Sequence, residues 1–172
     1  MNNITFIIEN VIADFRYNKM LSRHRGNGGT KLSTVDPFTV LHVSIYNSLV
    51  RDFVRKAAER KIKRVAAVAP FGACFDLSTI GRTTTGLDVP TIDLVLQENV
   101  EWTIYGGNSM VLVKKNVACL GFVDGGELSM TAVVIGGSQL QDNFLVFDLA
   151  SSKLSFSSSL LLHHTRCSHF RA

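Results

Sequence analysis

The chain has 172 residues, of which 46% are hydrophobic and 19% charged, and its formal net charge is +4. This length suits a single domain with a buried core of its own. No apolar run approaches the roughly 18 residues that cross a bilayer, so we expect no transmembrane helix and no membrane partner.

The first 25 residues differ from the rest of the chain. An apolar stretch without clear periodicity is followed by a basic, polar stretch that ends near Arg25. The N-terminus does not resemble a signal peptide, because it lacks a basic start and because Glu9 and Asn10 interrupt the apolar run. Asn3-Ile4-Thr5 is a glycosylation sequon that matters only if the chain enters the secretory pathway.

A more orderly pattern begins with Gly28 and Gly29, which predict a tight turn. A short strand and a small polar loop containing Ser33, Thr34 and Val35 follow, and a helix-forming run starts near His42. The arrangement resembles the entry to an active site from which the active residue is missing.

Residues 43–62 are predicted to form the main helix. Apolar residues recur there at helical spacing and make one stripe, while charged residues fill the opposite face. The stripe comprises Ile45, Tyr46, Leu49, Val50, Phe53, Val54 and Ala57.

Cations gather on this helix and its C-terminal end. Seven of the 18 Lys and Arg residues fall between Arg51 and Arg64, opposed only by Asp52 and Glu59. Such a cluster can bind nucleic acid or another polyanion. It is also what a solvated helix face with a basic last turn contains. No nucleic-acid-binding motif accompanies it, which favours the solvated face and no nucleic-acid partner.

After Pro70 the pattern changes to short strands rich in branched and aromatic residues, separated by glycine-containing turns. Many short strands with one substantial helix predict a mainly β domain. The predicted strands are Ile92–Leu96, Trp102–Ile104, Met110–Val113, Ala118–Val123, Ala132–Ile135, Phe144–Asp148 and Lys153–Phe156.

Motifs of the common catalytic and cofactor sites are missing. The carboxylates are scattered, with no spacing that favours an acid–base pair, and neither a G-x-S-x-G elbow nor a phosphate-binding glycine loop occurs. Cys74, Cys119 and Cys167 include no C-x-x-C pair, whereas a structural zinc site needs four ligands. We therefore expect no metal and no cofactor. In a secreted chain, three cysteines predict one disulfide and one leftover thiol.

The C-terminus carries a cationic cluster, in which His163 and His164 are followed by Arg166, Cys167 and His169. A metal site would need further ligands in a fixed geometry. Two other interpretations stay open. The cluster is a mobile tail, or it is a recognition tip whose imidazole and guanidinium groups bind carboxylates in the cleft of a partner.

Seven segments of the chain together point to a known family. They are GNGGTKLSTVDPFTVL (26–41), APFGACF (69–75), VPTIDLVLQ (89–97), GNSMV (107–111), VACLGFVDGG (117–126), VIGGSQL (134–140) and FDLASSKL (147–154). In order and spacing they closely resemble the C-terminal lobe of plant xylanase-inhibitor-like proteins. These form the basic 7S globulin and extracellular dermal glycoprotein group of the pepsin-like aspartic peptidase superfamily.

The resemblance implies that residues 26–172 form one lobe of the pepsin-like β-barrel fold. In active members each lobe supplies one catalytic Asp, and in this chain Ser33 stands at that position. A hydroxyl cannot share the proton of a carboxylate pair or carry its charge near neutral pH. Asp36 is displaced by three residues, and the N-terminal lobe is absent from this chain. The resemblance thus implies an inactive homologue, with an aspartic endopeptidase as the alternative.

Members of the group act as secreted binding proteins. Some inhibit microbial cell-wall glycoside hydrolases, xylanases and endoglucanases, by inserting basic side chains near the C-terminus between the catalytic carboxylates; others resemble seed storage globulins. By this resemblance His163, His164 and Arg166 are partner-binding residues, and the location is extracellular or in the cell wall. It also implies a disulfide between Cys74 and Cys119, and makes Cys167 the cysteine that links to the other lobe, unpaired in this chain.

Residues 1–25 carry no such resemblance. In full-length members a signal peptide and a whole N-terminal lobe precede the segment that starts at Gly26. Our hypothesis is that the chain is a truncated product whose first 25 residues come from outside the family.

Overall fold

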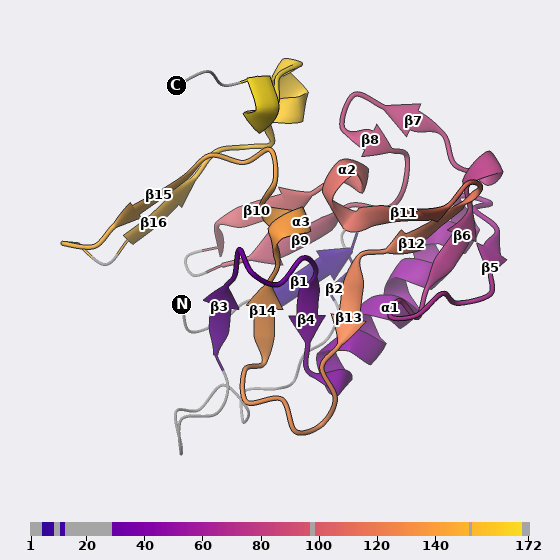
Figure 1. The fold of residues 1–172 in the computed structure, drawn as a ribbon, viewed down its shortest axis with the longest axis horizontal. Helices are drawn as coiled ribbons and strands as arrows, with labels where there is room; N and C mark the ends of the chain where they lie inside the picture. Colours follow the sequence, from indigo (N-terminus) through magenta and orange to yellow (C-terminus); the bar gives the residue numbers. More distant parts are fainter. Residues whose placement is uncertain (1–4, 9–10, 13–28, 97–98, 152, 170–172) are drawn as a thin grey trace.

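The computed structural model describes residues 5–8, 11–12, 29–96, 99–151 and 153–169. Within these residues the chain forms three four-stranded sheets, two separate hairpins and one long helix (Figure 1). The prediction of a mainly β domain is confirmed, and the described sheets are open rather than closed into a barrel. No helix in the described part of the chain is long and apolar enough to span a membrane.

The first sheet is wholly antiparallel, with strand order β10-β9-β1-β2. Its strands are β1 (Thr5–Ile8), β2 (Val11–Ile12), β9 (Ile92–Val95) and β10 (Glu101–Ile104). Part of the N-terminal segment is thus built into the sheet, since β1 pairs with β9 along its length. The proposed domain boundary at Gly26 and the start of the turn at Gly28 lie outside the described residues.

The second sheet is also antiparallel and has the order β11-β12-β6-β5. Its strands are β5 (Arg64–Val65), β6 (Cys74–Asp76), β11 (Met110–Lys114) and β12 (Val117–Leu120). Cys74 and Cys119 face each other across β6 and β12 and form a disulfide, the pairing that the resemblance implies.

The third sheet is mixed, with the order β13-β4-β14-β3. Its strands are β3 (Thr30–Leu32), β4 (Thr39–Leu41), β13 (Phe122–Asp124) and β14 (Val133–Ile135). β13 runs parallel to β4 and β14 parallel to β3, whereas β4 and β14 are antiparallel. The loop between β3 and β4 therefore leaves the sheet beside the end of β14, at the edge where the candidate site lies.

The remaining elements are short. The hairpin of β15 (Leu145–Asp148) and β16 (Lys153–Phe156) projects away from the sheets, as Figure 1 shows. The other hairpin, β7 (Arg82–Thr83) with β8 (Gly86–Leu87), lies beside the one-turn helix α2. The short helices are α2 (Gly106–Ser109), α3 (Gly137–Leu140) and the 3-10 turns η2 (Leu77–Thr79), η4 (Leu160–His163) and η5 (Cys167–His169).

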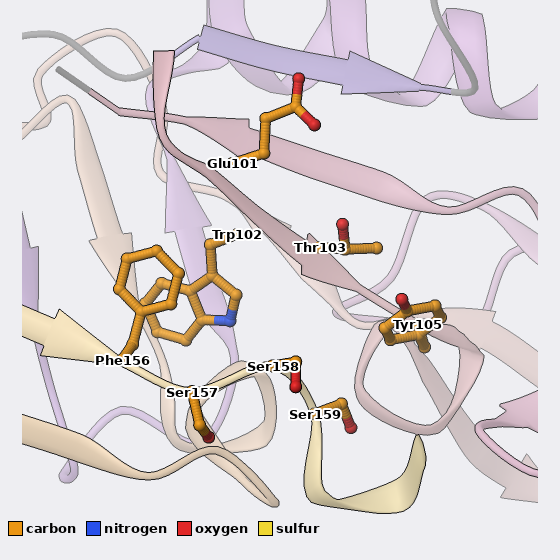
Figure 2. A pocket seen from close by; sticks show the side chains of 8 residues that line it. All are labelled: Glu101, Trp102, Thr103, Tyr105, Phe156, Ser157, Ser158 and Ser159. Atoms are coloured by element: carbon orange, nitrogen blue, oxygen red, sulfur yellow. The ribbon is translucent and has the colours of Figure 1, made fainter. Parts of the chain in front are cut away.

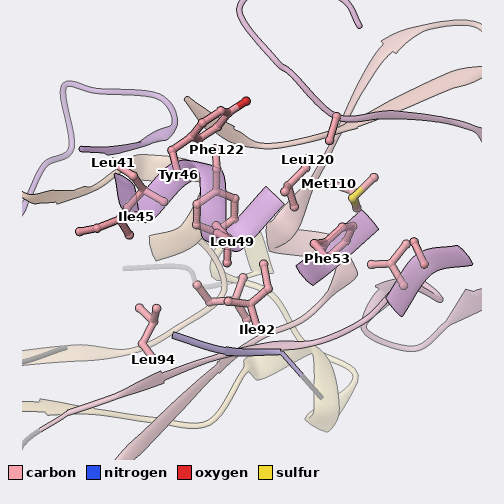
Figure 3. Close-up of a cluster of buried hydrophobic side chains, with 14 of the residues drawn as sticks. Leu41, Ile45, Tyr46, Leu49, Phe53, Ile92, Leu94, Met110, Leu120 and Phe122 are labelled. Carbon is pink, nitrogen blue, oxygen red and sulfur yellow. The ribbon is translucent and has the colours of Figure 1, made fainter. Parts of the chain in front are cut away.

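Helix α1 (Val43–Glu59) contributes more buried side chains to the apolar core than any other described element. The predicted apolar stripe is confirmed, because Leu49 and Phe53 are fully buried and Val50 and Val54 pack against the same cluster. Figure 3 shows Leu49 and Phe53 in one cluster with Ile92 from β9 and Phe122 from β13. The helix thus joins the first and third sheets through a single apolar core.

The predicted C-terminal end of this helix, at Ile62, is wrong by three residues. Lys61 adopts a left-handed conformation (φ 61°), which an α-helix cannot continue. The Lys61 N–H bonds to the Ala58 carbonyl at 2.9 Å and the Ile62 N–H to the Ala57 carbonyl at 3.0 Å. This hydrogen-bond pattern is the Schellman cap, in which the residue after the turn, Ile62, packs back into the core.

The predicted strand Ala118–Val123 is divided at Gly121, whereas the other predicted strands after Pro70 are confirmed to within one residue at each end. The Gly121 N–H bonds to the Ser109 carbonyl at 2.7 Å instead of to a neighbouring strand. A β-carbon there would lie 2.9 Å from Val111 Cγ2, so the close approach favours glycine. The chain crosses at this point from the second sheet to the third.

The side-chain amide of Gln139 in α3 links the sheets behind the β3–β4 loop. It is fully buried, and its Oε1 accepts from the Thr39 backbone N–H at 2.9 Å and from Thr39 Oγ1 at 2.8 Å. Its Nε2 donates to the carbonyls of Asn108 at 2.8 Å and Gly121 at 3.1 Å. All four hydrogen-bonding positions of the amide are therefore used, as burial requires.

We predict that Gln139→Leu lowers the free energy of unfolding by about 3–5 kcal/mol, because buried donors and acceptors lose their partners. Chemical denaturation measures this loss. The matched control is Gln141→Leu, two positions away with an exposed side chain, which should change stability by less than about 0.5 kcal/mol. Equal stability of the two variants would show that the network is dispensable.

The phenol oxygen of Tyr46 accepts a hydrogen bond from the Gly72 N–H at 3.0 Å. Tyr46→Phe should cost about 1 kcal/mol at pH 7, because a backbone N–H loses its acceptor. Burial of the phenol raises the pKa of Tyr46, so the folded state keeps the proton more tightly than the unfolded state, whose pKa is about 10. The wild type therefore loses stability as the pH rises above about 10, and the difference from Tyr46→Phe should shrink there.

Denaturation curves at pH 7 and in the alkaline range test this, with Tyr105→Phe on β10's C-terminal side as the control tyrosine. A constant difference between wild type and Tyr46→Phe across this range would contradict the raised pKa.

Candidate functional site

The loop between β3 and β4 starts at Ser33, whose backbone N–H bonds to the Ile135 carbonyl of β14 at 2.9 Å. The Ser33 side chain is largely buried, with 9% exposed. Its Oγ donates to Asp36 Oδ2 at 2.7 Å and accepts from the Asp36 backbone N–H at 3.1 Å. Ser33 and Asp36 thus close the loop by two reciprocal hydrogen bonds, while Val35 at its tip is 89% exposed.

The far side of this loop rests on the start of α3. The Gly137 N–H bonds to the Asp36 carbonyl at 2.8 Å, and the Ser138 N–H to the Pro37 carbonyl at 2.9 Å. A β-carbon on Gly136 would lie 2.2 Å from the carbonyl carbon of Phe38, so only glycine fits against this backbone. Backbone contacts that do not involve the Ser33 side chain therefore also hold the loop in place.

The chemistry available in this loop is limited. A pair of carboxyl groups with divergent pKa values is what acid–base hydrolysis needs, and the Ser33 side chain is hydrogen-bonded to one carboxylate, that of Asp36. No group of three or more His, Cys, Asp or Glu side chains in the described part of the chain is placed to hold a metal ion. What the loop offers is a polar, solvent-facing turn on a rigid base.

Two of the scattered carboxylates have structural roles in turns. Asp124 accepts from the Gly126 N–H at 2.8 Å. Asp148 accepts from Ser151 Oγ at 2.5 Å and from backbone N–H groups, and the hydrogen bond from the Ser151 side chain lowers the pKa of Asp148. Neither is paired with a second carboxylate in these turns.

The cationic residues of the C-terminus lie on an exposed turn between η4 and η5. His163 ends η4, His164 adopts a left-handed conformation (φ 54°), and Arg166 precedes η5; all three side chains are exposed. Asp142 holds this region by hydrogen bonds to the first residues of η4 and η5, a pair of contacts that we call the Asp142 clamp. Its carbonyl accepts from the Leu160 N–H at 2.7 Å, and its Oδ1 accepts from the Cys167 N–H at 3.0 Å.

The third cysteine, Cys167, has a free and exposed thiol. It lines a hollow of about 500 Å³ beside the exposed ring of Phe144. Arg166 and His169 lie on the same rim, so the hollow borders the cationic turn.

The cations of α1 are largely engaged in ion pairs. Arg51 and Arg55 lie 3.3 Å and 3.8 Å from the buried carboxylate of Asp52. Lys56 pairs with Glu59 at 3.1 Å, and Arg60 reaches Asp88 at 2.9 Å. These pairs reduce the positive charge that the 51–64 cluster presents to a polyanion, which favours the solvated-face interpretation.

Sequence reasoning missed three features of this region. Asp142 and Gln139 act through partners far away in the sequence, so no local pattern marks them. A polar cavity beside Trp102 was also missed, because its walls come from β10 and the segment after β16. The one signal available was that Trp102 is the only tryptophan in the chain.

A family model described as "Xylanase inhibitor C-terminal" matches residues 12–158. A relative from Nicotiana benthamiana named "Probable aspartic proteinase GIP2" is 55% identical over 148 residues, which make up 86% of this chain and 33% of that protein. The chain therefore spans about a third of the length of this curated relative.

Two crystal structures show the same fold. That of edgp is 50% identical with a TM-score of 0.92, over 97% of this chain and 41% of the other. That of basic 7S globulin from soybean is 30% identical with a TM-score of 0.78, over 98% of this chain and 41% of the other. With the matched family model, these similarities show that the chain belongs to the xylanase inhibitor C-terminal family and has a pepsin-like fold.

Proposed function

We propose that the chain is a non-catalytic, pepsin-like binding protein. The proposal depends on the residue at position 33. By the resemblance a catalytic carboxylate is expected there, but the residue is Ser33, whose hydroxyl donates a hydrogen bond to Asp36 Oδ2 at 2.7 Å. Relatives that are named globulins support a role without catalysis.

The competing function is aspartic endopeptidase activity, which the name of the Nicotiana benthamiana relative favours. A water held between two carboxylates is the chemistry of this class. Ser33 cannot supply one of them, and Asp36 is committed to closing the loop. We therefore rank peptidase activity second.

The partner that fits the proposal best is a microbial glycoside hydrolase, such as a xylanase or endoglucanase. Its cleft holds two carboxyl groups, and His163, His164 and Arg166 present donors and positive charge on an exposed turn. The sequence after Asp148 contains no acidic residue that would offset them. The Asp142 clamp orders the turn before binding, which lowers the entropy lost in the complex.

The proposal includes an extracellular or cell-wall location, where such hydrolases act on plant material. The disulfide between Cys74 and Cys119 suits an oxidising compartment. A storage role like that of the seed globulins is compatible with the same location. Binding of a polyanion through Arg51–Arg64 is the least supported alternative, given the ion pairs on that face.

We predict no proteolysis of a denatured protein substrate at any pH between 2 and 8, for the wild type or for Ser33→Asp. One restored carboxylate does not make a pair. A pepsin-type enzyme serves as the positive control in the same assay. Cleavage that an aspartic-peptidase inhibitor blocks would refute the proposal.

Binding to a panel of microbial xylanases and endoglucanases tests the partner. We expect at least one hydrolase to be retained and inhibited, and Arg166→Ala or the pair His163→Ala with His164→Ala to weaken binding by about 10-fold or more, since each truncation removes a charge-assisted contact.

The matched control is Lys115→Ala, which removes the same charge from an exposed turn between β11 and β12. It should bind as the wild type does. If Lys115→Ala and Arg166→Ala weaken binding equally, the hydrolase is attracted by the net charge of the chain. That result would contradict a specific binding role for the turn that carries His163, His164 and Arg166.

A further inference from the structure

Four exposed lysines lie near one end of the second sheet, and we call them the lysine patch. They are Lys61 and Lys63, which follow α1, and Lys114 and Lys115, which lie at the turn between β11 and β12. Lys61 and Lys63 belong to the cationic cluster noted in the sequence, whereas the other two lysines come from a segment about 50 residues later. Nothing in the proposed function uses this patch.

The register of the sheet places two of these lysines on the same face. The Asp76 N–H bonds to the Lys63 carbonyl at 2.9 Å, which extends the pairing of β5 and β6 by one residue. Asp76 lies opposite Val117 on β12, and Val117 lies opposite Lys114 on β11. Because opposite residues of antiparallel strands share a face, Lys63 and Lys114 point to the same side of the sheet. Three strand spacings separate them, a span of roughly 14 Å.

Hydrogen bonds hold the turn between β11 and β12 against β6. Asn116 Nδ2 donates to Asp76 Oδ1 at 2.8 Å, and the Leu77 N–H bonds to the Asn116 carbonyl at 3.0 Å. Figure 1 shows the tip of this hairpin beside β6. Lys114 and Lys115 are thus carried by an anchored turn, so a ligand that contacts them does not have to order the backbone first.

The lysine patch is not neutralised by ion pairs. None of its four lysines forms a salt bridge with another described residue. Glu59, the acid that precedes the patch, pairs with Lys56 at 3.1 Å. Asp76 lies within the row, and hydrogen bonds from Ser78 lower the pKa of Asp76, with a smaller contribution from the charge of Lys63. Four lysines and one ionised aspartate leave a net charge of +3.

The other polar regions of the surface differ from the lysine patch in charge. The cavity beside Trp102, shown in Figure 2, is lined by Glu101 and by no Lys, Arg or His. The cations of α1 are engaged in the ion pairs described above, so they add little to the patch. The patch is therefore a distinct site for an anionic partner, carried by the second sheet.

The composition of the patch narrows the class of anion. Lysine ammonium groups are separate point charges and do not form the planar fork with which arginine binds one phosphate or carboxylate. They match a polymer whose charges are spaced along its length. Single-stranded nucleic acid needs aromatic side chains on which its bases stack, and the exposed phenylalanines of the described chain, Phe144 and Phe147, lie at β15. The disulfide between Cys74 and Cys119 lies in the same sheet and suits an oxidising compartment, which favours a glycan over a nucleic acid.

We propose that the lysine patch binds an acidic polysaccharide, a linear chain with a carboxylate on each sugar, at this end of the second sheet. The choice of a polysaccharide rests on the extracellular location in the proposed function. The charge of the patch and the register of its lysines do not depend on that location.

Fluorescence anisotropy of labelled polygalacturonate, titrated with the purified chain, tests the proposal. We expect saturable binding whose affinity falls with salt between about 20 and 200 mM, with a slope of log affinity against log salt concentration of about −2 to −3, because each neutralised carboxylate releases counterions. Fully methyl-esterified polygalacturonate has the same backbone without the charge and should not bind.

Variants assign this binding to the lysine patch. Lys63→Ala combined with Lys114→Ala should weaken binding by about 10-fold at low salt and make the slope shallower by about 1 to 2. The matched control is Lys31→Ala combined with Lys153→Ala, which removes the same net charge from exposed positions on β3 and β16. It should change the affinity by less than about 2-fold, since exposed charges farther away than a Debye length are screened. Circular dichroism checks that all variants fold.

The proposal is overturned if polygalacturonate does not bind at low salt, if the two double variants lose affinity equally, or if the esterified polymer binds as tightly as the acidic one. Tighter binding of duplex DNA or RNA than of polygalacturonate would also overturn it, in favour of a nucleic-acid site. The assay contains no hydrolase, so its failure would leave the proposed function standing, and failure of the hydrolase assay would not affect its result.

Discussion

The fully buried amide of Gln139 is the contact on which the arrangement around the loop depends. It bonds to β4 through Thr39, to α2 through Asn108 and to the crossing point between the second and third sheets at Gly121. These partners lie up to 100 residues from Gln139 in the sequence. An apolar side chain of similar size would fill the same volume but leave these groups unpaired, so the polar network specifies one packing of the sheets.

The same network extends to the loop between β3 and β4. Thr39 Oγ1 accepts from the Gly136 N–H at 3.1 Å, and the next two N–H groups of α3 bond to the carbonyls of Asp36 and Pro37. Every one of these contacts is made by the backbone or by residues other than Ser33. The far side of the loop is therefore held by these contacts, in addition to the two hydrogen bonds between Ser33 and Asp36 that close it.

The main helix and most strands were predictable, because Leu49 and Phe53 recur at helical spacing and the strands alternate with glycine turns. The end of α1 was not, since the left-handed position is occupied by Lys61 and not by the glycine that usually marks such a cap. The division of the Ala118–Val123 strand depends on the approach of Val111 to Gly121, which is a tertiary contact. For the site, Ser33 was found through resemblance alone, and Asp142, which orders the cationic turn, gives no local signal.

The cationic turn depends on two contacts from residues outside it. Asp142 accepts from the Leu160 and Cys167 N–H groups, and Ser159 Oγ accepts from the Leu161 N–H at the start of η4, which ends at His163. A change at Asp142 or Ser159 would therefore disturb the order of the turn without removing a cation from it, whereas a change at Arg166 removes the cation and leaves both contacts in place. The two kinds of change separate the contribution of an ordered turn to partner binding from the contribution of charge.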